Sequence, residues 1–73
     1  MSALQVLDRN GHTEIAFDVK EQVTVDAARQ EFMHKLEEGY LAYTVVDGKA
    51  DTAIREFDPE AQRIVMTPAL VGG

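Results

Sequence analysis

Cysteine is absent from this chain of 73 residues, and tryptophan is absent as well. Without cysteine, disulfide bonds, zinc–thiolate sites and thiol nucleophiles are all excluded. A domain of this length without such cross-links must be stabilised by the packing of its core. A protein of this kind suits a reducing compartment, and we predict a cytoplasmic location.

Basic residues are few: 7 lysines and arginines stand against 13 aspartates and glutamates, and the formal net charge is −6. This charge repels the phosphates of DNA and RNA, so we expect no nucleic-acid partner and favour a partner with a basic surface. Long apolar runs are also missing, since a membrane span needs about 20 consecutive apolar residues. The first residues show no basic cluster followed by an apolar run, so we expect neither a signal peptide nor a membrane partner.

The short chain limits the functions that a single domain can perform. Apolar residues make up 45% and charged residues 27% of the sequence, which is typical of a folded globular domain. A domain of this size has little room for a substrate cleft in addition to its scaffold. We therefore expect a carrier, adaptor or binding module that is not an enzyme and uses no cofactor.

The N-terminal segment predicts a β-hairpin. Residues 4–8 form a short strand candidate, and residues 12–18 form a second one. The Asn10-Gly11 pair between them suits a tight turn, because both residues tolerate positive φ. In the second strand, threonine, isoleucine and phenylalanine alternate with other residues, which indicates a half-buried strand.

Apolar residues then recur at helical spacing. We expect a helix from about Val25 to Glu38, with Thr24 as its N-cap and Asp26 in the first turn, where it complements the helix dipole. Gly39 suits the left-handed residue that often ends a helix. The stripe predicted to face the core consists of Val25, Ala28, Phe32 and Leu36.

After the helix the apolar period returns to two, which predicts a strand. We expect Leu41, Tyr43 and Val45 to face the core and the residues between them to face away. The Asp47-Gly48 pair predicts a turn at the end of this strand.

The last part of the chain predicts two further strands. Residues 49–52 are expected to form a polar loop and residues 54–57 a weak strand. Pro59 presets the φ of a following turn, and residues 63–67 form the last strand. The buried face of that strand is expected to carry Ile64 and Met66.

The order of elements is therefore strand, strand, helix, strand, strand, strand. One helix with an apolar stripe covers one face of a mixed sheet, which predicts a two-layer α+β domain. This is the element order of the β-grasp fold, the fold of ubiquitin. A ferredoxin-like half or an irregular α+β roll is the alternative, although the missing second helix argues against a complete ferredoxin-like fold.

The residues after the last strand do not suit a packed element. Pro68 has no N–H for a sheet ladder, so strand pairing should stop there, and we divide the chain into a domain (1–68) and a flexible tail (69–73). Gly72 and Gly73 have no side chain to bury, and glycine costs conformational entropy wherever it is ordered. A functional interpretation is a chain end that threads a narrow channel and presents a carboxylate to an ATP-using enzyme. The alternative is an end without a role.

The ending TPALVGG resembles the proline-containing, diglycine ending of the sulfur carrier of molybdopterin synthesis. The element order and the diglycine also resemble ubiquitin and the thiamin-pathway sulfur carrier. The resemblance implies a β-grasp fold and a Gly73 carboxylate, preceded by Gly72, that an activating enzyme adenylates. The carboxylate then becomes a thiocarboxylate or is joined to an amine.

The resemblance also implies partners. These are an adenylating activating enzyme and, for conjugation, an isopeptidase, a conjugating enzyme or a target protein. Residues 55–61 match no motif of either sulfur carrier. Sulfur delivery and protein conjugation therefore both stay open, and a separate bacterial ubiquitin-like branch is suggested.

The remaining titratable residues form no catalytic motif. His12 and His34 have no cysteine partner and share no local motif, so we interpret them as solvated or interfacial side chains rather than metal ligands. Surface charge is the favoured interpretation of four acidic residues, Glu37, Glu38, Asp58 and Glu60.

Arg55 and Arg63 lie on the two late predicted strands and are candidates for a partner surface. Their alternative role is to pair with acidic residues across the sheet. A second functional hypothesis covers the whole chain: a non-catalytic β-grasp interaction or structural module, such as a phage or plasmid accessory protein, with an inert tail.

Overall fold

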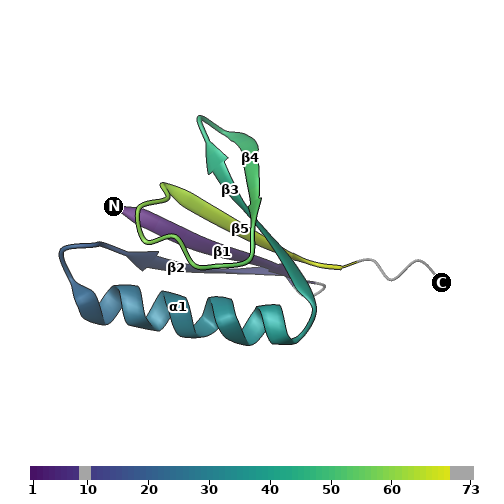
Figure 1. Ribbon diagram of the computed structural model, residues 1–73, viewed down its shortest axis with the longest axis horizontal. Helices are drawn as coiled ribbons and strands as arrows, with labels where there is room; N and C mark the ends of the chain where they lie inside the picture. The colour runs from purple at the N-terminus through teal and green to yellow at the C-terminus, as the bar shows by residue number, and fades with distance from the viewer. Residues whose placement is uncertain (9–10, 70–73) are drawn as a thin grey trace.

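The structure is a computed structural model that describes residues 1–8 and 11–69. Among these residues, one helix lies along one face of a five-stranded sheet, which gives two layers (Figure 1). The predicted α+β class and the order ββαβββ are confirmed. The elements are β1 (Ser2–Asp8), β2 (Gly11–Phe17), α1 (Gln22–Glu37), β3 (Tyr40–Val46), β4 (Lys49–Ile54) and β5 (Arg63–Pro68).

The sheet is mixed, and its strand order is β2-β1-β5-β3-β4. β1 and β5 run parallel, whereas β1–β2, β3–β5 and β3–β4 are antiparallel pairs. The last strand of the chain is therefore an internal strand, which pairs on both sides. β2 and β4 form the two edges.

The predicted N-terminal hairpin is confirmed. The β1–β2 pairing runs from Ser2 opposite Phe17 to Asp8 opposite Gly11. Gly11 has a φ of 126°, a conformation that a residue without Cβ adopts at no steric cost. Asn10 lies outside the described residues.

The start of the helix differs from the prediction. The N-cap is Glu21 rather than Thr24, and its side chain makes no capping hydrogen bond. Thr24 lies inside the first turn, where its hydroxyl donates toward the carbonyl oxygen of Glu21 at 2.6 Å and accepts from the N–H of Asp18 at 2.9 Å. The threonine thus fastens the β2–α1 connection to the helix. Because the helix begins at Gln22, Asp26 lies beyond its first turn.

The end of the helix follows the expected pattern. Gly39 has a φ of 95°, and its N–H donates to the carbonyl oxygen of Leu36 at 3.0 Å. This left-handed residue satisfies one of the last helical carbonyls and redirects the chain into β3. In the part of the chain that the structure describes, no helix has the length and apolar character needed to cross a membrane.

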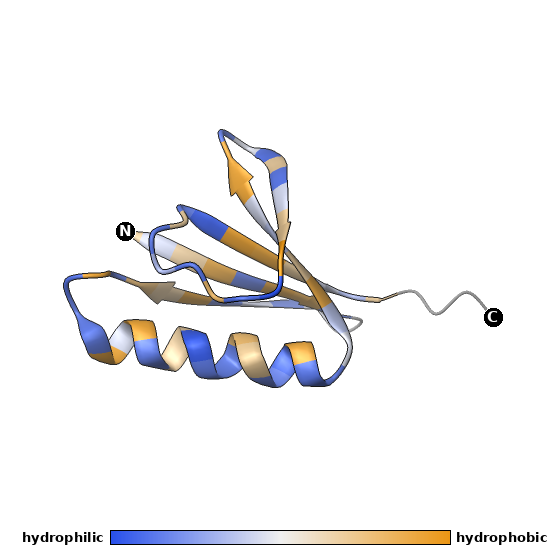
Figure 2. Cartoon of the chain, in the orientation of Figure 1, coloured by the Kyte–Doolittle hydropathy of each residue, from blue (hydrophilic) through white to orange (hydrophobic). Residues whose placement is uncertain are grey.

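The core lies between α1 and the sheet face that the helix covers. In Figure 2, apolar and polar bands alternate along α1, and β5 is apolar over most of its length. The helix contributes the predicted stripe, of which Leu36 is only partly buried. The fully buried large side chains are Leu4, Val6, Phe17, Phe32, Ile64 and Met66.

A small aromatic cluster closes one part of this core. The ring of Phe57 lies 5.1 Å from that of Phe17 and 5.6 Å from that of Phe32, between centroids. Phe57 is not in a strand, because β4 ends at Ile54. The connection after β4 therefore folds back over the core, and the predicted strand over residues 54–57 is wrong.

The buried face of β3 is the opposite of the predicted one. Leu41 is 59% exposed, whereas Ala42 is 4% exposed. Residues directly opposite each other in an antiparallel pair point to the same side of the sheet. Ala42 lies opposite Met66, whose side chain is in the core, so Ala42 must face the helix and Leu41 must face away.

β4 begins earlier than expected, because the predicted polar loop over residues 49–52 is part of the strand. The register of the β3–β4 pair shifts between Tyr43 and Val45, which marks a β-bulge. Thr44 faces this bulge and is 9% exposed. Its hydroxyl accepts the N–H of Thr52 at 3.3 Å and so supplies a partner at the irregular position.

Candidate functional site

The end of β5 is the structural base of the predicted tail. The ladder between β3 and β5 ends with Tyr40 opposite Pro68, and both Pro68 and Ala69 are exposed. Within the described residues, the pairing of β5 stops at Pro68, as predicted, since β3 begins at its partner Tyr40 and proline has no N–H to extend the ladder. Gly72 and Gly73, the predicted activation residues, lie outside the described residues.

Several elements converge at this end of the molecule. Figure 1 shows that β5 ends on the side of the view where α1 and β1 end and where β3 begins. Of these elements, β3 is the direct neighbour of Pro68, which lies opposite Tyr40.

The sheet face that no helix covers carries an apolar strip beside this end. Val65 lies opposite Tyr43, and Leu41 lies opposite Thr67, the residue before Pro68. Val65 is only 6% exposed, since neighbouring strands flank it on both sides, whereas Leu41 is 59% exposed. We call Leu41, Tyr43 and Val65 the outer strip. It leads from the middle of the sheet to the end of β5.

Arg63 lies at the start of β5 and is tied to residues of the N-terminal hairpin. Its Nη1 atom donates to Glu14 Oε1 at 2.7 Å and to Gln5 Oε1 at 3.1 Å. The arginine therefore reaches across β1 to a carboxylate on β2. This contact supports the expected role as a partner for an acid, although the Arg63 side chain keeps 40% of its surface exposed.

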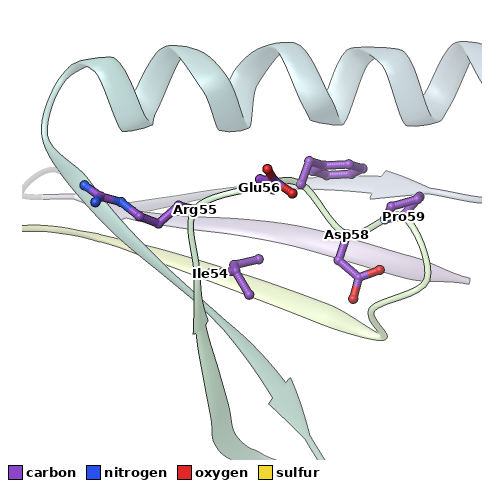
Figure 3. Close-up of a pocket in the computed structure, with 6 residues that line it drawn as sticks. Ile54, Arg55, Glu56, Asp58 and Pro59 are labelled. Atoms are coloured by element: carbon purple, nitrogen blue, oxygen red, sulfur yellow. The ribbon is translucent and has the colours of Figure 1, made fainter.

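Arg55 lies elsewhere. It follows the end of β4, and β3 separates β4 from β5 in the sheet. Figure 3 shows the Arg55 side chain pointing away from Asp58 and Pro59, toward the connection between α1 and β3. The two arginines therefore present their charges on different parts of the molecule.

The histidines and acidic residues occupy surface positions. His34 lies on α1 between two carboxylates, with Nε2 3.2 Å from Glu38 and Nδ1 3.7 Å from Glu31. Asp58 has a local structural role, because its Oδ1 atom accepts the N–H of Glu60 at 2.9 Å and fixes the turn around Pro59. His12 is exposed on β2.

Sequence reasoning missed the outer strip because it assigned Leu41 and Tyr43 to the core. The alternation of apolar residues on β5 shows on which face of the sheet they lie. Ile64 and Met66 belong to the core face of β5, so Val65 between them faces outward, and its partner on β3 must do the same.

Comparisons of the chain with protein-family models, with curated proteins and with solved structures give no match.

Proposed function

We propose that this protein is a β-grasp carrier or modifier whose C-terminal glycine carboxylate, at Gly73, is adenylated by an activating enzyme and then thiolated or conjugated. The fold assignment is supported by one helix packed across a mixed sheet whose first and last strands are parallel neighbours. The observation that carries the function is the placement of β5. It is held between β1 and β3 and stops at Pro68, directly before the tail.

The proposed chemistry takes place on the protein, which contributes no catalytic side chain. In a chain that ends at Gly73, a carboxylate oxygen attacks the α-phosphorus of ATP, and pyrophosphate leaves. A sulfur or nitrogen nucleophile then attacks the resulting acyl-adenylate, and AMP leaves. The enzyme supplies ATP, metal and catalytic groups, and Gly72 and Gly73 pass through its channel because they have no Cβ atoms.

The internal position of β5 explains how a small domain supports such a tail. Pairs with β1 reach Val65 and Met66, and pairs with β3 continue to Pro68. A force on the tail is therefore resisted by two ladders rather than by a single edge. The activating enzyme can hold the rigid domain while it acts on the tail beyond the sheet.

In this proposal the activating enzyme recognises the domain through the sheet face that α1 does not cover. The outer strip supplies an apolar contact surface, with Leu41 as its most exposed member. Arg63 adds a partly exposed guanidinium on the same face, next to the carboxylate of Glu14. Apolar residues bordered by charged groups are the usual composition of a protein interface.

A binding module with an inert tail is the second candidate, because the outer strip exists independently of the tail. The two candidates differ in whether an adenylating enzyme modifies the protein in the presence of ATP.

We would incubate the chain ending at Gly73 with ATP, magnesium and a candidate adenylating enzyme and measure the intact mass. The carrier gains an adenylyl group, or exchanges one carboxylate oxygen for sulfur when a sulfur donor is added, because the oxygen leaves with AMP. A module remains unmodified with every adenylating enzyme encoded beside its gene, and that result would favour the second candidate.

A further inference from the structure

One edge of β3 has no strand beside it over its first residues. β3 begins at Tyr40, but its pairing with β4 reaches only to Ala42 opposite Ile54. The chain after Ile54 leaves the sheet toward Phe57 instead of continuing along β3. In the described ranges 1–8 and 11–69, no other strand lies on this side of Tyr40 and Leu41. Their backbone edge therefore faces an open groove.

The groove at this edge has a volume of about 470 Å³. The end of α1 forms one wall and the end of β4 forms the other, while β3 forms the floor. The lining of the groove is mostly apolar and includes Leu36, Tyr40, Ala42 and Ile54, with Arg55 at its end. Gly39 is also part of the lining.

Arg55 gives the groove a positive charge that no acidic residue in the described part of the chain neutralises. The other two described arginines have carboxylate partners, since Arg29 lies 3.6 Å from Asp26 and Arg63 lies 2.7 Å from Glu14. Arg55 has no ion pair or hydrogen bond within the described part of the chain and is exposed. An unpaired guanidinium beside an apolar groove is notable in a protein of net charge −6.

A second cation lies close to the floor of the groove. The ammonium nitrogen of Lys35 is 5.1 Å from the centroid of the Tyr40 ring and 3.7 Å from a carboxylate oxygen of Glu38. Lys35 is thus partly neutralised, and Arg55 is the charge available to a ligand. The chemistry of the groove is complementary to an apolar ligand that carries a carboxylate.

We propose that this groove binds an extended, apolar peptide segment of a partner protein that includes an acidic residue. The segment adds as a strand to the open edge of β3, where its backbone pairs with that of Tyr40 and Leu41. Side chains on one of its faces enter the groove, because successive strand residues point to opposite sides. Its carboxylate pairs with Arg55.

A peptide can use both the open backbone edge of β3 and the apolar groove beside Arg55, so we favour a peptide over a small organic acid. An acyl chain with a carboxylate would use the apolar walls and Arg55, but it would leave the backbone edge of β3 unpaired. The proposed binding does not depend on the chemistry of the tail.

The test uses the isotope-labelled chain and a synthetic peptide, acetylated Ser-Val-Ile-Val-Asp-Glu-Ser-amide, in an NMR titration. Shift changes are expected at Tyr40, Leu41, Ile54 and Arg55. A peptide N-methylated at alternate residues should not bind, because it lacks the N–H groups needed for pairing. The variant Arg55→Glu should weaken binding about fivefold, since it replaces an exposed charge attraction with repulsion. Lys20→Glu is the control, because it makes the same change of charge in the β2–α1 connection.

Any one of the following results would overturn the proposal. The peptide could fail to bind, or its shift changes could map to β2 or to Val65 and leave Tyr40, Ile54 and Arg55 unchanged. Equal affinity of the N-methylated peptide would exclude strand addition, and equal effects of Arg55→Glu and Lys20→Glu would exclude a specific carboxylate contact. Hexanoate that shifts the groove signals when the peptide does not would assign the groove to a small acid. Shifts at the same residues that depend on protein concentration alone would assign it to a second copy of the chain.

Discussion

Truncation of two apolar side chains provides a matched test of the core. Phe32 is fully buried and its ring contacts that of Phe57, whereas Leu41 is 59% exposed. Phe32→Ala removes a large side chain that the surroundings cannot replace, and its expected cost is about 3–5 kcal/mol. Leu41→Ala removes mostly exposed surface and should cost about 1 kcal/mol or less.

These differences are large compared with the stability of a small domain. A chain of this length is expected to have a free energy of unfolding of roughly 4–11 kcal/mol. Urea unfolding followed by circular dichroism measures both variants, and with a slope of about 1 kcal/mol per molar the midpoint of Phe32→Ala should fall by about 3–5 M. Equal losses for the two variants would refute the assignment of β3 faces, because Leu41 would then have to be in the core.

Three smaller effects follow from individual hydrogen bonds and ion pairs. Thr44→Val should cost about 1–3 kcal/mol in urea unfolding, because the N–H of Thr52 loses its acceptor in the β-bulge. Thr24→Ala should cost about 0.5–1.5 kcal/mol, and the amide of Asp18 should exchange its hydrogen faster, because it loses its hydrogen-bond acceptor in the β2–α1 connection. Arg63→Gln should cost less than about 1 kcal/mol, and the difference from wild type should shrink in high salt, because its carboxylate pair is partly exposed.

Each of these effects has a result that contradicts it. A neutral Thr44→Val would show that the bulge amide finds another partner. If the amide hydrogen of Asp18 exchanges at an unchanged rate in Thr24→Ala, then Thr24 does not stabilise the β2–α1 connection. A large loss for Arg63→Gln that persists in high salt would mean that packing of the arginine stem, rather than its charge, is the important contribution.

Local patterns predicted the hairpin and the helix because the relevant interactions are close in sequence. The Asn10-Gly11 pair separates two short strand patterns in the sequence, and Gly11, the first residue of β2, has the expected positive φ. The stripe around Phe32 has one clear period, and Gly39 ends the helix as expected. The N-terminus of the helix was less predictable, because Thr24 bonds backward to Asp18 instead of capping at its own position.

The face of β3 was beyond local reasoning because both faces of this strand are partly apolar. Its orientation depends on a partner distant in sequence: Ala42 lies opposite Met66, and the helix then covers the smaller side chain. Phe57 likewise reaches the core through a connection and not through a strand, so alternation could not locate it. The same error concealed the outer strip, whereas the end of the ladder at Pro68 followed directly from proline chemistry.

The most direct test of the carrier function compares three chains in ATP–pyrophosphate exchange with the cognate adenylating enzyme: the chain ending at Gly73, a chain lacking Gly72 and Gly73, and a chain with one alanine added after Gly73. Because the described core and ladder are complete at Pro68, we expect all three to have the same melting temperature. Only the first should support exchange, since the others end in a different residue whose side chain must enter the channel. Equal exchange by the truncated chain would contradict the carrier function, and a lowered melting temperature would show that the glycines are structural.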